Sequence, residues 1–119
     1  IKTGVATCKK HEEALHLLEY FGVKDDIDYV SGLVYNKRET KAQVVDYALK
    51  NLGVTAKECV MVGDTIYDVE GAEEIGMDCI LCLWGFGDYE KIHNKNVIFS
   101  AKTPNDVTEF VKRNYSDKI

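Results

Sequence analysis

The sequence has no long hydrophobic run and no excess of positive charge. Its longest stretch without a charged residue, Cys79–Gly87, is far shorter than the roughly 20 apolar residues that span a bilayer. Lysine and arginine number 15 against 20 aspartates and glutamates, which gives a net charge of −5, and no block of like charge stands out. We therefore expect no membrane partner and no nucleic-acid partner, because a nucleic-acid-binding face needs clustered basic residues.

Cysteine is also scarce. Four cysteines are too few for a disulfide scaffold, and they suit a reducing compartment. Cys79 and Cys82 form a C-x-x-C sequence, but it lies in an apolar run that predicts a strand, where residues three apart face opposite sides of the sheet. We interpret these two cysteines as core residues rather than a redox pair. With no signal-peptide pattern in the sequence, we expect a cytoplasmic protein.

The 119 residues have the composition of a single globular domain, with 45% hydrophobic and 29% charged residues. Apolar runs and helical periodicities alternate along the chain. They predict strands near residues 5–7, 27–31, 59–62, 79–84 and 97–99, and helices near residues 10–21, 40–52, 65–75 and from 103 onward, before a loose tail at 115–119. Because the central strands are apolar throughout, both faces of the sheet should be covered. The pattern is typical of an α/β fold: a Rossmann-like three-layer sandwich with a mostly parallel sheet.

Local signals predict where individual helices begin, end and pack. The sequence T-K-A-Q from Thr40 to Gln43 predicts a capping box, and Gly53 predicts the end of that helix. Phe21 falls on the apolar face expected for the first helix. The pair Asn36-Lys37 suggests a hairpin turn in the loop before Thr40.

The most specific motif is the run Gly63-Asp64-Thr65-Ile66-Tyr67-Asp68, which follows a buried strand and opens a helix. Asp64 and Asp68 are four residues apart, so one helical turn places both carboxylates on the same side, at the carboxyl end of the strand. A cation would offset their repulsion, and Mg²⁺ prefers such oxygen ligands. The alternative is structural: Asp64 as an N-cap and Asp68 as a first-turn acid stabilised by the helix dipole. The motif alone leaves both interpretations open.

Two further residues suggest a phosphate site. Thr7 ends the first predicted strand with a hydroxyl, and Cys8 lies beside it. Lys41 lies in the first turn of its helix, where a cation is unfavourable unless an anion lies in front of it. With the paired aspartates at a third strand end, these residues form a phosphate-plus-metal constellation. Taken alone, Lys41 is also consistent with a solvated surface lysine.

These residues carry a resemblance to a known family. Thr7, Lys41 and the run VMVGDTIYDVEGAEEIGMDCILCLWGFG (Val60–Gly87) resemble motifs II, III and IV of the haloacid dehalogenase superfamily, nearest to its phosphoglycolate-phosphatase-like branch. The resemblance extends over nearly the whole chain. It implies that Thr7 binds the transferred phosphoryl group, with Cys8 beside it, and that Lys41 neutralises the phosphate and the nucleophile. It also implies that Asp64 ligates Mg²⁺ and that Asp68 supports the metal site.

The sequence departs from the family pattern at motif I. Family members begin with a strand ending in D-x-D-G-T, whose first Asp attacks phosphorus, and no such run occurs here. Asp26-Ile27-Asp28 matches D-x-D, but no apolar strand precedes it and Tyr-Val follows, so we interpret it as a loop. The cap domain is also missing. The chain thus resembles the C-terminal part of a Mg²⁺-dependent phosphomonoester hydrolase for a small phosphorylated metabolite, and we expect it to be inactive alone. The alternative is a non-catalytic α/β module that binds a phosphate or a partner.

The missing motif I strand raises a question about the sheet. In the family this strand lies between the strands that end here at Thr7 and Gly63. The vacant position could be filled by the missing N-terminal segment or by a strand from a second copy, or the flanking strands could pair directly. We expect direct pairing and a five-stranded sheet, because buried, unpaired main-chain groups are costly. For Trp84 and Phe86 we expect packing at the end of the sheet, with the lining of a substrate pocket as the alternative.

Overall fold

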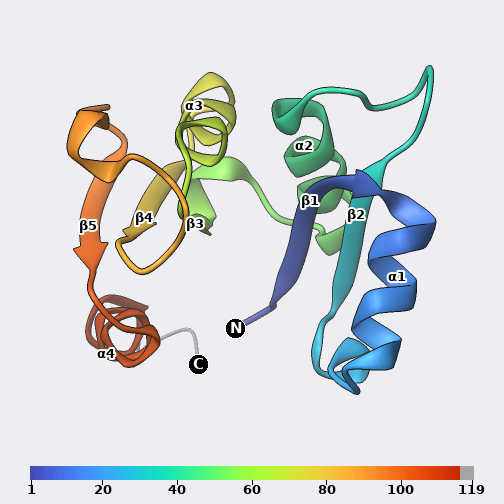
Figure 1. Ribbon diagram of the computed structural model, residues 1–119, viewed down its shortest axis with the longest axis horizontal. Helices are drawn as coiled ribbons and strands as arrows, with labels where there is room; N and C mark the ends of the chain where they lie inside the picture. Colours follow the sequence, from blue (N-terminus) through green and yellow to red (C-terminus); the bar gives the residue numbers. More distant parts are fainter. Residues whose placement is uncertain (116–119) are drawn as a thin grey trace. The chain divides into compact units, whose positions relative to one another are not determined.

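The computed structural model describes residues 1–115 of the chain. It consists of two compact units, the N-terminal unit Lys2–Glu58 and the C-terminal unit, which comprises the described residues from Cys59 onward together with Ile1 (Figure 1). Within the described residues, none of the helices combines the length and the apolar character needed to cross a bilayer. Each unit is an α/β layer with its own parallel sheet, and each is described by itself.

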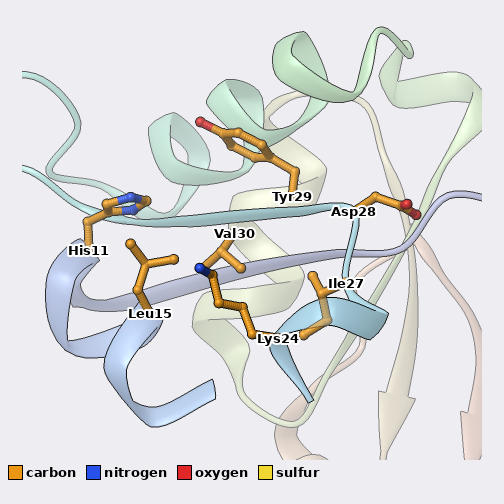
Figure 2. Close-up of a pocket in the computed structure, with 7 residues that line it drawn as sticks. All are labelled: His11, Leu15, Lys24, Ile27, Asp28, Tyr29 and Val30. Atoms are coloured by element: carbon orange, nitrogen blue, oxygen red, sulfur yellow. The ribbon is translucent and has the colours of Figure 1, made fainter. Parts of the chain in front are cut away.

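The N-terminal unit is a strand pair with one helix on each face. Its elements are β1 (Gly4–Lys10), α1 (His11–Tyr20), the short helix η1 (Lys24–Asp26), β2 (Tyr29–Leu33), α2 (Lys41–Leu52) and the short helix η2 (Ala56–Glu58). β1 and β2 are parallel, with Val5 opposite Val30. In Figure 2 the two strands run between α1 on one side and α2 on the other.

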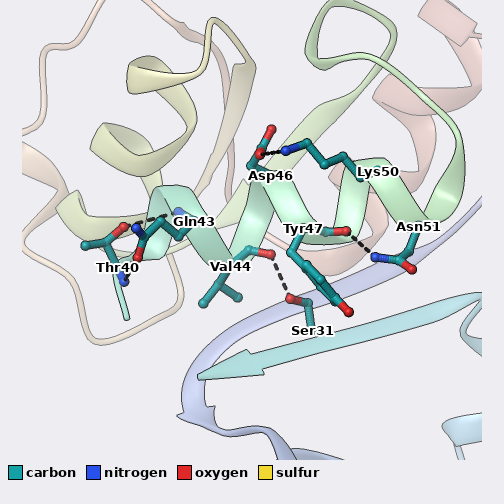
Figure 3. A network of polar contacts seen from close by, with 8 residues as sticks. All are labelled: Ser31, Thr40, Gln43, Val44, Asp46, Tyr47, Lys50 and Asn51. Carbon is teal, nitrogen blue, oxygen red and sulfur yellow. Dashed lines mark hydrogen bonds and ion pairs between the residues drawn. The ribbon is translucent and has the colours of Figure 1, made fainter. Parts of the chain in front are cut away.

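Helix α2 is fixed at both ends by the signals that the sequence predicts. The Thr40 hydroxyl accepts a hydrogen bond from the Gln43 amide (3.2 Å), and the Gln43 side-chain oxygen accepts from the Thr40 amide (3.1 Å). Gly53 ends the helix in the left-handed conformation, with a φ of 71°. On the inner face, the buried Ser31 hydroxyl of β2 donates to the Val44 carbonyl over 2.7 Å (Figure 3). The capping box and the helix stop are therefore confirmed.

The C-terminal unit has a three-stranded parallel sheet in the order β3-β4-β5. Its elements are β3 (Val60–Gly63), α3 (Ile66–Glu74), β4 (Asp78–Cys82), the short helix η3 (Tyr89–Lys91), β5 (Val97–Ala101) and α4 (Pro104–Tyr115). The middle strand β4 supplies the core, where Cys79 and Ile80 are wholly buried. Phe99 of β5 stacks on Phe110 of α4, with 4.5 Å between ring centroids.

The α/β class, the parallel pairing and the five strands are confirmed. Within the N-terminal unit β1 pairs with β2, and within the C-terminal unit β4 lies between β3 and β5. The expected pairing of β1 with β3 would join the two units, and it stays a prediction.

Three smaller expectations concern Phe21, the hairpin turn and the tail. Phe21 does not pack on the core: it caps α1, and 69% of its surface is exposed. The hairpin turn is present, because Val34 and Arg38 form an antiparallel bridge and Asn36 between them has a φ of 61°. Of the expected loose tail, Tyr115 belongs to α4, and residues 116–119 lie outside the described residues.

Candidate functional site

Three of the residues expected to bind phosphate lie together in the N-terminal unit. Lys41 is the first residue of α2, and its ammonium group donates to the Ala6 carbonyl of β1 over 2.7 Å. This bond places the Lys41 charge beside Thr7, the next residue along β1. Cys8 follows Thr7 and is exposed. The structure therefore brings Thr7, Cys8 and Lys41 to one place on the edge of this unit.

Thr7 does not end its strand as expected, because β1 continues to Lys10. The regular pairing with β2 stops after Ala6 and resumes only at Lys10, so Thr7 lies at an irregularity in the ladder. There its hydroxyl accepts a hydrogen bond from the Lys9 amide over 3.2 Å. The Thr7 hydroxyl is thus engaged in a local turn within the strand.

The two expected metal ligands lie together in the C-terminal unit. Asp64 follows β3, and Asp68 lies in the first turn of α3. One carboxylate oxygen of Asp68 accepts hydrogen bonds from the Asp64 amide (3.1 Å) and from both the amide and the hydroxyl of Thr65 (3.3 Å each). Thr65, not Asp64, is the N-cap of α3. The structural alternative thus holds for Asp68 as a first-turn acid but not for Asp64 as a cap.

Asp64 is held by a residue that the sequence does not point to directly. Its Oδ2 accepts a hydrogen bond from the main-chain amide of Phe86, 22 residues away, over 3.0 Å. Phe86 itself is fully exposed and 47% of the Trp84 surface is exposed, so the expected packing of Phe86 is wrong. The glycines on either side of Phe86 in W-G-F-G were the available signal, because glycine allows close approach of the main chain.

Glycine also makes room for Asp68. A Cβ atom built on Gly63 would lie 2.5 Å from the carboxyl carbon of Asp68, closer than real Cβ atoms approach another heavy atom. The space that a side chain would fill at position 63 is thus occupied by the Asp68 carboxylate. This explains Gly63 at the end of β3 as a steric requirement of Asp68.

The carboxylates of Asp64 and Asp68 affect the pKa of Cys82, at the end of the neighbouring strand β4. Burial raises the pKa of the Cys82 thiol at the end of β4, and the negative charges of Asp64 and Asp68 raise it further. A raised pKa keeps the thiol protonated and unreactive at neutral pH. The interpretation of Cys79 and Cys82 as buried core residues is confirmed.

Asp64 and Asp68 fit Mg²⁺ better than a metal ion whose ligands all come from the protein. Within residues 1–115, no group of three or more histidine, cysteine or acidic side chains is placed to hold a metal ion. Mg²⁺ needs fewer protein ligands, because it is commonly bound through one or two carboxylates while keeping several waters. Asp64 and Asp68, in the space left by glycine and with their combined charge, match that requirement.

A cavity of about 220 Å³ in the N-terminal unit lies between α1, η1 and β2 (Figure 2). Its polar groups are already engaged: His11 Nδ1 accepts from the Gly32 amide, Lys24 pairs with Glu19, and Asp28 accepts from the Thr3 amide. In Figure 2, Asp28 and Tyr29 point away from the other lining side chains. The cavity therefore brings no reactive groups together.

Comparison with known proteins places this arrangement in a family. Residues 1–82 match the model of haloacid dehalogenase-like hydrolases. The tyrosine-protein kinase PtkA of Mycobacterium tuberculosis is 30% identical over 112 residues, which are 92% of this chain and 38% of that protein. A phosphoglycolate phosphatase of Rhodospirillum rubrum is 34% identical over 87 residues, 72% of this chain and 36% of that protein.

Among solved structures, a "predicted phosphatase" from Clostridium acetobutylicum superposes with a TM-score of 0.87 at 27% identity, covering 95% of this chain and 53% of that one. The chain belongs to the haloacid dehalogenase-like hydrolase family, whose enzymes generally use Mg²⁺. It spans between about a third and about half of the length of these relatives.

Proposed function

We propose that this chain is the part of a Mg²⁺-dependent phosphomonoester hydrolase that binds the metal and the phosphate of a small phosphorylated metabolite in the cytoplasm. The observation that carries the proposal is the Asp64–Asp68 pair at the end of β3, in a chain that belongs to a hydrolase family. Two half-buried carboxylates at the start of α3 repel each other, and a divalent cation offsets that repulsion.

Each residue has a distinct role in the proposal. Lys41 supplies positive charge for the phosphate, and its bond to Ala6 holds that charge beside Thr7. Thr7 and Cys8 contribute polar groups where the β1 ladder is interrupted. Asp64 and Asp68 hold the metal, which when bound withdraws charge from the phosphate oxygens. Stabilising the charge of the phosphoryl group is the larger part of catalysis in this class of reaction.

In the proposed reaction an aspartate attacks phosphorus, the ester P–O bond breaks and the alcohol leaves, which gives an aspartyl phosphate. Water then breaks the aspartyl phosphate, which releases phosphate and restores the carboxylate. The 119 residues contain no D-x-D-G-T run, so the proposed nucleophile is not among them. The remaining partner is therefore a segment that carries this motif, from the same protein or from a second copy. Without it, the chain can bind and neutralise a phosphate but has no group placed to attack it.

The proposal is tested by kcat/KM for p-nitrophenyl phosphate in the full-length protein with Mg²⁺. Asp64→Asn keeps the shape of the side chain and removes its charge, and we expect kcat/KM to fall by about 100-fold or more. Asp78→Asn, at the exposed start of β4, is the matched control and should leave kcat/KM unchanged. Normal turnover by the Asp64→Asn enzyme would overturn the metal assignment.

One observation favours a second candidate function, that of a protein kinase. The similarity to the tyrosine-protein kinase PtkA extends over 92% of the chain, so transfer of a phosphoryl group to a protein hydroxyl is also to be tested. Incubation of the full-length protein with labelled ATP and a tyrosine-containing protein distinguishes the two. Labelled protein without release of phosphate from small esters would favour the kinase. Neither activity, with phosphate binding retained, would favour a non-catalytic binding module.

A further inference from the structure

The loop that follows β4 makes an unusual contact with Asp64. The Phe86 amide donates to Asp64 Oδ2 over 3.0 Å, although the two residues are 22 positions apart. The Phe86 side chain is fully exposed, so burial of the ring does not hold this part of the loop in place. Residue 86 is thus joined to the body of the unit through its main chain, by a hydrogen bond to a carboxylate.

The glycines on both sides of Phe86 are required by Asp64. A Cβ atom on Gly85 would overlap the Asp64 carboxylate, at 2.5 Å from its carboxyl carbon. A Cβ atom on Gly87 would overlap the Asp64 carbonyl oxygen, at 2.8 Å from the carbonyl carbon and 3.0 Å from the Cα of Thr65. Neither glycine has a positive φ, so the requirement is for space and not for an unusual backbone conformation.

We propose that Gly85-Phe86-Gly87 is a backbone support for Asp64 that sets the orientation of its carboxylate toward the metal. The Phe86 amide donates to Oδ2, and Oδ1 is the oxygen that would ligate the cation. The two glycines let the main chain approach closely enough for this bond to form. The inference rests on the proposed function, because it assigns these three residues as positioning residues for the same metal site.

The proposal predicts an effect that a merely structural loop would not have. A loop that only closes the end of the sheet should affect the melting temperature when it is altered, and leave the metal affinity unchanged. Residues that orient a metal ligand typically change affinity by about 10- to 100-fold when substituted. Metal affinity, measured apart from stability and from activity, therefore separates the two cases.

The experiment is Mg²⁺ titration calorimetry on the full-length protein, its Gly85→Ala and Gly87→Ala variants, and Gly4→Ala as control. Gly4 lies in β1, where a Cβ would contact the flexible end of Leu52 at 3.1 Å. We expect a loss of Mg²⁺ affinity of about 10-fold or more in Gly85→Ala and Gly87→Ala, and none in Gly4→Ala. Circular dichroism verifies that each variant is folded. Folded variants at positions 85 and 87 that bind Mg²⁺ like the wild type would overturn the proposal.

A second measurement on the wild type decides the matter if the glycine variants do not fold. The Phe86 amide resonance should shift during Mg²⁺ titration, with the same midpoint as the calorimetric binding curve, because its acceptor carboxylate takes up the cation. An unmoved Phe86 resonance during saturation would overturn the proposal. A wild type that binds no Mg²⁺ contradicts the proposed function as well. If Asp64→Asn loses Mg²⁺ binding while the folded Gly85→Ala and Gly87→Ala variants bind like the wild type, only the support by the loop is contradicted.

Discussion

At the residue scale, Asp64 and Asp68 make different contacts, although the sequence leaves a metal ligand and a helix-terminal acid open for both. Asp68 is a helix-terminal acid bonded to the first amides of α3, as its position predicts. Asp64 instead reaches the loop after β4, through a contact between distant parts of the chain. A spacing of four residues in the sequence predicts that the carboxylates share a side, but it contains no information about Phe86. That contact depends on how β3 and β4 pair.

Cys82 provides a prediction at this scale for the metal-free protein. Its pKa is raised above the usual 9.0 by burial and by the charges of Asp64 and Asp68, so the folded state favours the protonated thiol. The stability that this confers is complete below the usual pKa of 9.0 and is lost as the pH rises through the raised value. We expect the free energy of unfolding to fall more steeply above pH 9 in the wild type than in Cys82→Ala.

The measurement is urea denaturation in EDTA between about pH 7 and pH 10, with Cys8→Ala as the control. Cys8 is exposed, and its substitution should leave the slope with pH unchanged. Parallel curves for the wild type and Cys82→Ala would contradict the raised pKa.

At the scale of elements, the sequence predicts best what is determined locally. The capping box at Thr40 and the stop at Gly53 depend on residues within one turn, and both are observed. The end of β1 and the exposure of Phe21 depend on tertiary pairing and on what covers the helix, and both differ from expectation.

Arg38 illustrates an element held by a contact that the sequence does not reveal. Its guanidinium Nε donates to the Gly32 carbonyl of β2 (2.9 Å), and the group lies 3.9 Å from the centre of the Tyr47 ring of α2. The side chain is 7% exposed. It thus links the hairpin 34–38 to both a strand and a helix of the N-terminal unit.

We expect Arg38→Ala to lower the free energy of unfolding by about 1.5–3 kcal/mol, because a charged hydrogen bond and a cation–π contact are lost together. Lys37→Ala, at the exposed neighbouring position, should change it by less than about 0.5 kcal/mol. Urea denaturation measures both. A loss in Arg38→Ala no larger than that in Lys37→Ala would show that these contacts contribute little.

At the scale of the whole molecule, the candidate residues are divided between the two units. Thr7, Cys8 and Lys41 belong to Lys2–Glu58, and the paired aspartates belong to the C-terminal unit. The C-terminal unit offers two carboxylates and no third metal ligand within residues 1–115. We therefore expect the 119-residue chain alone to bind Mg²⁺ weakly and to release no phosphate from p-nitrophenyl phosphate above background. Tight, stoichiometric Mg²⁺ binding in calorimetry of this chain would contradict that expectation.

The central proposal is that Lys41 and Asp64 serve one reaction. A double-mutant cycle on the full-length protein, with kcat/KM for p-nitrophenyl phosphate in Mg²⁺, tests it most directly. Groups that act as a unit on the same phosphate give strongly non-additive losses. We predict that Lys41→Met with Asp64→Asn loses no more activity than the worse single variant. Losses that multiply, or a Lys41→Met enzyme with normal turnover, would contradict the account.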